Sequence, residues 1–273
     1  MHMQKTTDSI HFFKITYIDA AYLYGTNIPG LPAGISTVGR IRSLGNGHID
    51  ICFSWSSALM LKGIIIPFGI LLSITPIGTS NEDCTPWVDS IKKAQDGAQS
   101  RIQLIQAELS NVGTGSRLAV DWNDIRIYGN GYVKSPTPMY LEGIFAGCNE
   151  TTAFFLNPEN INLEKARNHP EKKADLFSIP LGMIQSWKTT GKEVGDEAVL
   201  PLLPQDDCAT SPGICYQVAC IEYNSGTAKM YASGFILTED KDSIQIASTL
   251  NINGPTESLT LSRKDILSVH YLK

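Results

Sequence analysis

The sequence predicts an all-β protein with one long helix, built from three tandem small β-barrels. Three observations predict this fold: one β-rich pattern occurs three times, a glycine stands at the same place in each occurrence, and a single amphipathic segment separates the first two. The chain has 273 residues, of which 42% are hydrophobic and 18% charged. This composition is enough to bury one large core or several small ones.

The same strand pattern occurs three times along the chain, which is typical of tandem modules. Each copy passes from its glycine through a polar turn into an alternating apolar strand, and then into two apolar strands separated by a split. The marker residues are three glycines, three split residues and three serines six positions after each split: Gly39, Gly143 and Gly234; Pro67, Pro180 and Ser262; Ser73, Ser186 and Ser268.

An alternating run also precedes each glycine, over residues 13–18, 125–128 and 216–223. Each copy therefore contains about five short strands, and a glycine at a bend permits the curvature that closes such strands into a small barrel. The predicted organisation assigns one range to each part: barrel 1 at 1–80, the connecting helix at 81–117, barrel 2 at 118–192 with a loop insertion at 157–174, an acidic linker at 193–212, and barrel 3 at 213–273.

Residues 58–77 form the most apolar stretch of the chain. Lys62 followed by the uncharged run from Gly63 to Ile77 imitates a signal peptide or a membrane segment, which is the alternative interpretation. Three Pro and Gly residues interrupt the run, and it is shorter than the roughly 20 apolar residues of a membrane span. We therefore predict buried barrel strands, no membrane association and, from the absence of a secretory pattern at the N-terminus, a cytoplasmic location.

Residues 84–112 form the clearest helix, with Thr85 as the predicted N-cap and Pro86 at the first helical position. Apolar residues recur at spacings of three and four, which places them on one stripe. The stripe either packs on a neighbouring barrel or binds a second chain. In the second interpretation the partner-binding residues are Trp87, Ile91, Ile102, Ile105 and Leu109.

The repeated pattern resembles the two sequence motifs of the Sm-like small β-barrels, and the third copy resembles them best. The resemblance implies an SH3-like barrel fold and an assembly of barrels edge to edge. In Sm rings an Asp-x-x-apolar-Asn sequence and an Arg-Gly pair line an RNA pocket. Here Asp50 and Asp242 lack the following Asn, and the Arg-Gly position reads Phe68-Gly69, Leu181-Gly182 and Arg263-Lys264. The RNA-binding residues of the family therefore do not carry over.

Charge and motif content argue against several function classes. The net charge is −5, from 22 basic and 27 acidic residues, so the chain has no general positive field for a nucleic acid. The five histidines lie far apart, no C-x-x-C pair occurs among the six cysteines, and phosphate-loop and nucleophile-elbow motifs are absent. The sequence thus predicts no catalytic residue, no cofactor and no metal site; zinc at Cys208, Cys215 and Cys220 is the alternative.

The predicted function is that of a non-catalytic binding or assembly protein: an adaptor, a scaffold or a ligand-sequestering protein made of Sm-like barrels. Its predicted partners are further copies of itself or another protein, with a small-molecule ligand as an additional option. An RNA-binding Sm-type protein and a hydrolase with a site between modules are the alternatives. The resemblance is also compatible with a phage or mobile-element origin.

Overall fold

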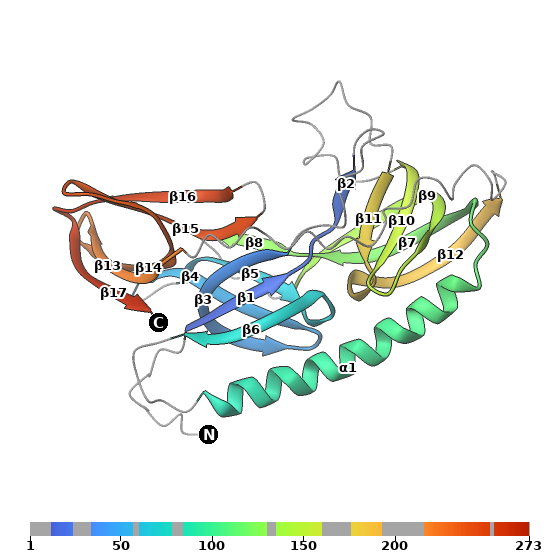
Figure 1. Ribbon diagram of the computed structural model, residues 1–273, viewed down its shortest axis with the longest axis horizontal. Coiled ribbons are helices and arrows are strands. Elements are labelled where there is room, and N and C mark those ends of the chain that lie inside the picture. The colour runs from blue at the N-terminus through green and yellow to red at the C-terminus, as the bar shows by residue number, and fades with distance from the viewer. Residues whose placement is uncertain are drawn as a thin grey trace.

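The computed structural model describes residues 12–23, 34–56, 60–77, 84–129, 135–159, 176–192, 216–251 and 254–272. Over these residues the chain is mostly β-strand with one α-helix, which confirms the predicted all-β class with one long helix. The strands form one sheet of eleven strands and one of six. Figure 1 shows the helix α1 running from beneath β6 towards the end of β12.

The first copy is a five-stranded unit in which the strands neighbour one another in the order β6-β1-β3-β4-β5. A 3-10 turn, η1 (Phe68–Ile70), joins the fourth strand to the fifth at the predicted split. The strands are β1 (Phe12–Tyr17), β3 (Ile35–Gly45), β4 (His48–Ser56), β5 (Met60–Pro67) and β6 (Leu71–Ile77).

The second copy repeats this arrangement in the order β12-β7-β9-β10-β11. Its 3-10 turn, η2 (Leu181–Met183), again joins the fourth and fifth strands. The strands are β7 (Ser116–Asp124), β9 (Thr137–Cys148), β10 (Thr152–Glu159), β11 (Leu176–Pro180) and β12 (Ile184–Lys192). Most of the predicted insertion at 157–174 and all of the predicted linker at 193–212 lie outside the described residues.

The third copy has the same strand order, β17-β13-β14-β15-β16. A short turn replaces the 3-10 helix between its fourth and fifth strands. The strands are β13 (Val218–Ser225), β14 (Ala228–Glu239), β15 (Ser243–Asn251), β16 (Gly254–Ser262) and β17 (Ile266–Leu272).

The pairing register shows that the sequence repeat is also a structural repeat. In every copy the marker serine pairs with a first-strand residue that lies three positions after the partner of the marker glycine. The glycine pairs are Phe13↔Gly39, Leu118↔Gly143 and Ala219↔Gly234, and the serine pairs are Thr16↔Ser73, Asp121↔Ser186 and Glu222↔Ser268.

One backbone hydrogen bond recurs at the same place in all three copies. It joins the turn after the fourth strand to the turn before the third. The bonds are Phe68 N–H to Gly47 O at 3.0 Å, Leu181 N–H to Thr151 O at 2.7 Å and Arg263 N–H to Asp242 O at 2.9 Å. The three copies therefore share their loop geometry as well as their strand order.

The first two copies exchange short strands. β8 (Arg126–Gly129), from the second copy, pairs with β5, while β2 (Ala21–Leu23), from the first copy, pairs with β11. The prediction that residues 125–128 form the first strand of the second copy is therefore wrong, because that strand is β7. Alternation identified residues 125–128 correctly as a strand, but it does not specify which sheet edge a strand joins.

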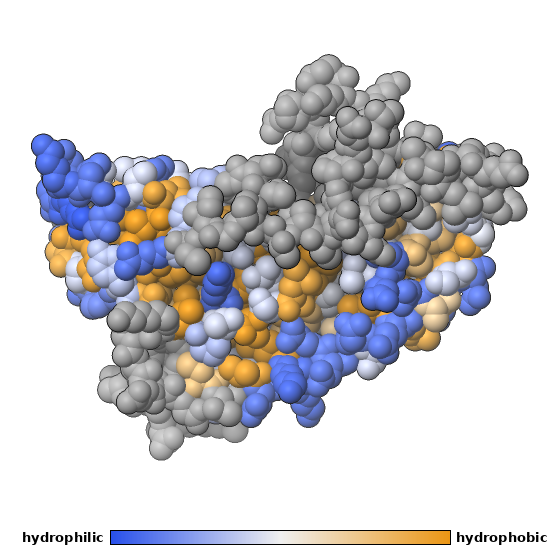
Figure 2. Space-filling model, in the orientation of Figure 1, coloured by the Kyte–Doolittle hydropathy of each residue, from blue (hydrophilic) through white to orange (hydrophobic). Residues whose placement is uncertain are grey.

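The helix α1 (Thr85–Ser110) lies against η1 and η2 and so covers the junction of the first two copies. It begins one residue earlier than predicted, because Cys84 occupies the N-cap and Thr85 is already helical. Figure 2 shows hydrophilic residues along the outer side of this helix. Its opposite side joins the main hydrophobic core.

The third copy joins the first by strand pairing between β14 and β4 and between β15 and β3. Trp55 and Tyr231 stack across this junction with ring centroids 5.6 Å apart. Arg40 lies over the Trp55 ring at 5.4 Å from its centroid. A small apolar cluster that includes Phe12, Cys52 and Cys220 completes the contact.

Within the predicted apolar segment, residues 60–67 and 71–77 form strands and residues 68–70 form a 3-10 turn; β5 is buried as predicted, whereas no described residue of β6 is fully buried. Ile64, Ile65 and Ile66 on β5 are fully buried, whereas Leu72 on β6 is 53% exposed. In the part of the chain that the structure describes, no helix has the length and apolar character needed to cross a bilayer.

Candidate functional site

The five residues predicted to bind a partner lie on the inner side of α1. Ile91, Ile102, Ile105 and Leu109 are buried in the main core of the chain, and Trp87 packs against that core in a partly buried position. The stripe is thus occupied by the chain's own strands and 3-10 turns. This arrangement favours the first of the two interpretations of the helix, packing within the chain.

Beneath α1 the two 3-10 turns cross in direct backbone contact. A Cβ added to Gly182 would lie 2.1 Å from the carbonyl oxygen of Gly69, and a Cβ added to Gly69 would lie 2.6 Å from the Cα of Gly182. Neither position therefore accepts a side chain in this arrangement. The glycines of the Phe68-Gly69 and Leu181-Gly182 pairs serve here to bring the two copies together.

A cleft of about 430 Å³ opens beside this crossing. Its walls come from the β3–β4 turn, the two 3-10 turns, α1, the end of β7, Pro136 before β9, and the start of β12. The lining residues are 45–48, 67–69, Ala94, Gly97, Ala98, Arg101, Ile102, Ile105, Asn123, Pro136, Leu181, Gly182 and Gln185. The cleft thus depends on the pairing of the first two copies and on the helix that covers them.

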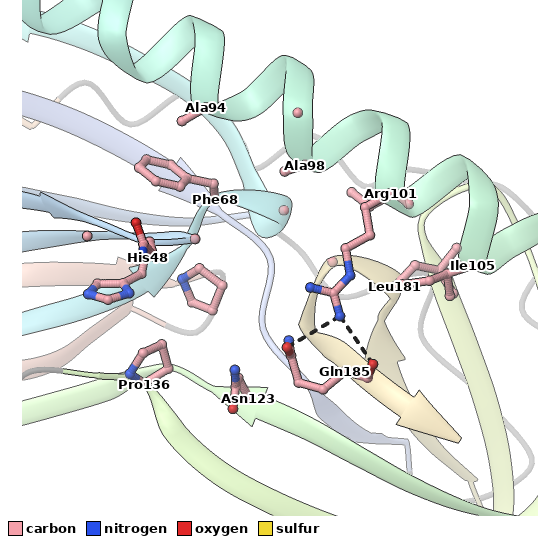
Figure 3. A pocket seen from close by; sticks show the side chains of 18 residues that line it. His48, Phe68, Ala94, Ala98, Arg101, Ile105, Asn123, Pro136, Leu181 and Gln185 are labelled. Carbon is pink, nitrogen blue, oxygen red and sulfur yellow. Dashed lines mark hydrogen bonds between the residues drawn. The ribbon is translucent and has the colours of Figure 1, made fainter. Parts of the chain in front are cut away.

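Arg101 is the main charged group of the cleft. Its Nη2 donates hydrogen bonds to the carbonyl oxygen of Ile184 at 3.1 Å and to the carbonyl and Oε1 oxygens of Gln185 at 3.2 and 3.3 Å. Figure 3 shows this side chain extending from α1 towards Gln185, with His48 and Pro136 on the other side of the view. Three acceptors on one nitrogen fix the orientation of the planar guanidinium.

The remaining polar groups of the cleft are neutral amides and one imidazole. Asn46, Asn123 and Gln185 each carry an amide, and His48 carries the imidazole. Among the described lining residues none is acidic. The cleft therefore offers one fixed positive charge, several hydrogen-bond donors and acceptors, and an apolar wall of alanine, isoleucine and phenylalanine side chains.

Sequence reasoning did not identify this cleft. The signal available was the pair of Phe68-Gly69 and Leu181-Gly182 positions, which align with the family's Arg-Gly pair but lack its arginine. The arginine of the cleft comes instead from α1, at position 101, outside every repeat copy. No spacing within a single copy predicts that contribution.

A second polar cluster joins the first two copies away from the cleft. The Asp50 carboxylate, 3% exposed, accepts a hydrogen bond of 2.7 Å from the Tyr128 hydroxyl and forms an ion pair of 3.1 Å with Arg42. Burial raises the pKa of Asp50, an effect that the Tyr128 hydrogen bond and the Arg42 charge oppose. Burial and the neighbouring Asp50 also raise the pKa of Tyr128.

This buried cluster attaches the exchanged strand β8 to the first copy. Tyr128 belongs to β8 in the second copy, whereas Asp50 lies on β4 and Arg42 on β3. Tyr128 and Arg42 each pair with the Asp50 carboxylate. The cluster therefore serves as a structural contact between the two copies. Asp50, which lacks the Asn that follows the aspartate in the Sm motif, here accepts a hydrogen bond from a tyrosine of the neighbouring copy.

The described cysteines are free thiols. Cys52 and Cys220 are buried at the junction of the first and third copies, and burial raises the pKa of the Cys52 thiol to about 11 and that of Cys220 to about 12. Of the three cysteines in the alternative zinc prediction, Cys208 and Cys215 lie outside the described residues. Within the described ranges, no group of three or more His, Cys, Asp and Glu residues is placed to hold a metal ion.

Comparisons of the chain with protein-family models, with curated proteins and with solved structures found no match. The resemblance to Sm-like barrels therefore stays a prediction from the sequence pattern.

Proposed function

We propose that this chain is a non-catalytic binding protein that holds a small organic molecule in the cleft beneath α1. The observation that carries the proposal is the cleft itself, whose volume of about 430 Å³ falls within the roughly 300–1,000 Å³ typical of ligand pockets. It combines an apolar wall with a few convergent polar groups, which is the usual composition of such sites. Of the functions predicted from the sequence, ligand sequestration is the one this geometry supports best.

A cleft-filling variant tests this proposal. Ala98 lines the cleft from α1, so Ala98→Phe should occupy ligand space while leaving the strand contacts of both copies in place. We expect wild-type protein to retain a small molecule in native mass spectrometry, or to gain thermal stability from members of a metabolite library. Ala98→Phe should lose that retained mass or that stabilisation.

The matched control is Ala107→Phe, since Ala107 is exposed on the same helix and does not line the cleft. This variant should behave like wild type in both measurements. A wild-type chain that carries no small molecule and gains no stability from any compound contradicts the proposal. Equal ligand retention by Ala98→Phe and wild type would place the ligand elsewhere.

We also propose that the chain self-associates through open strand edges. Within the described residues β6, β12, β16 and β17 each pair with one strand, which leaves one edge of each strand unpaired. Leu72 on β6 and Leu267 on β17 are 53% and 51% exposed. An unpaired edge is a template for a strand of another chain, and closed symmetric assemblies are the usual outcome.

Light scattering at micromolar concentration should therefore give a mass of at least twice 29.8 kDa. A monodisperse monomer would contradict self-association. Charged substitutions at Ile102 and Ile105 are unsuitable for this test, because both side chains are buried within the chain. Such variants would report on folding and not on association.

A further inference from the structure

We infer that the ligand of the cleft is a small organic anion whose carboxylate or phosphate group is bound by Arg101. This inference rests on the proposed ligand-binding function and names the chemical class of the ligand. Among the described lining residues Arg101 supplies a positive charge and no side chain supplies a negative one. A neutral ligand would form no ion pair with Arg101, and a cationic ligand would be repelled by it.

The geometry of Arg101 leaves a free edge of the guanidinium. All three of its hydrogen bonds use Nη2, and Nε and Nη1 make no hydrogen bond to any residue that the structure describes. A guanidinium has five N–H donors in a rigid plane, which match a carboxylate or phosphate in paired hydrogen bonds. Because Gln185 already fixes the plane, an incoming anion meets a preorganised donor edge.

The rest of the cleft lining supplies further hydrogen-bonding groups. His48, Asn46 and Asn123 face the same cleft from the first and second copies. Gly45 leaves room for the imidazole, since a Cβ there would lie 2.3 Å from His48 Nε2. These groups can hydrogen-bond polar atoms of the ligand that lie beyond its acidic group.

Gly97 leaves room for an occupant against the helix. It lies in the interior of α1, where glycine is unfavourable relative to alanine, and it lines the cleft. A Cβ added at this position would meet no atom within 4 Å. The helix surface at Gly97 is therefore open to the cleft, with room for an occupant.

Phenyl phosphate, benzoate and the neutral analogue benzamide are suitable probes, with binding followed by ligand-observed NMR and titration calorimetry. At least one anion should bind at least about tenfold more tightly than benzamide, the difference expected for a charge-assisted hydrogen bond. Comparison of benzoate with phenyl phosphate decides between a carboxylate and a phosphate. The affinity should also fall as salt is added, because Arg101 is exposed to solvent.

Arg101→Gln should abolish the preference for the anion, while Lys93→Gln, on an exposed position of the same helix, should keep it. Gly97→Leu should block binding and leave thermal stability unchanged or higher, which separates loss of binding from loss of fold. Equal binding of benzoate, phenyl phosphate and benzamide, or an Arg101→Gln variant with wild-type preference, would overturn the anion inference and leave the ligand-binding proposal intact. If no probe and no library compound binds, both fail.

Discussion

Gly182→Ala should destabilise the protein by about 3 kcal/mol, at the upper end of the cost of overpacking a well-packed site. The added methyl group would lie 2.1 Å from the carbonyl oxygen of Gly69, and the obstacle is backbone, which cannot rotate away as a side chain can. The clash is relieved only if η1 and η2 move apart. That movement also disturbs the packing of α1, which covers both turns. Urea denaturation followed by tryptophan fluorescence measures the change in unfolding free energy.

Gly191→Ala is the matched control for this substitution. Gly191 lies on β12 in the same copy, and a Cβ there would meet no atom within 4 Å. Its unfolding free energy should stay within about 0.5 kcal/mol of wild type, as for most surface substitutions. A Gly182→Ala variant that unfolds at the same urea concentration as this control would show that the two turns do not depend on their close crossing.

Asp50→Ala should destabilise the protein by about 3 kcal/mol, because it breaks the buried ion pair between Asp50 and Arg42. The Arg42 side chain is 16% exposed, so water compensates only partly for the lost carboxylate. The substitution also removes the acceptor of the Tyr128 hydroxyl. The same denaturation experiment applies, and Asp96→Ala, at an exposed position on α1, serves as the control.

Asp50→Asn adds a measurement that a general packing defect would not reproduce. The pKa of Asp50 in the folded chain is raised above its ordinary value of 3.8, mainly by burial. Folding therefore favours the protonated form, and the stability it provides is full below the ordinary pKa and is lost as the pH rises through the raised one. Asparagine does not titrate, so the stability of wild type relative to Asp50→Asn should decrease over that interval. An unchanged difference from acid to neutral pH would contradict the assigned environment.

The strand plan of each copy could be predicted from sequence because its determinants are local. Gly39 and Gly234 stand where the second and third strands approach closely, and added Cβ atoms there would lie 2.6 and 2.5 Å from opposing carbonyl oxygens. The requirement for glycine at such a position recurs at a fixed place in the repeat, so it can be recognised in the sequence without a structure. The buried stripe of α1 was predictable for the same reason, since helical periodicity is local.

The partners of these elements could not be predicted in the same way. Residues 125–128 alternate as a strand should, yet the strand they form adds to the edge of the first copy and not to their own. Tyr128, whose hydroxyl donates a hydrogen bond to Asp50, lies 78 positions away in sequence. An alternating pattern predicts which face of a strand is buried. It does not predict which sheet edge the strand joins, because many edges are compatible with the same buried face.

The sequence by itself determined that the chain is all-β with one long helix, where the three repeats lie, and which face of the helix is apolar. Only the tertiary structure decided that the first two copies exchange strands, that two glycine turns cross beneath the helix, and that Arg101 reaches a cleft beside that crossing. The physical reason is the range of the interactions. Periodicity and close backbone approach within a copy constrain neighbouring residues, whereas the cleft depends on contacts between segments that no local pattern connects.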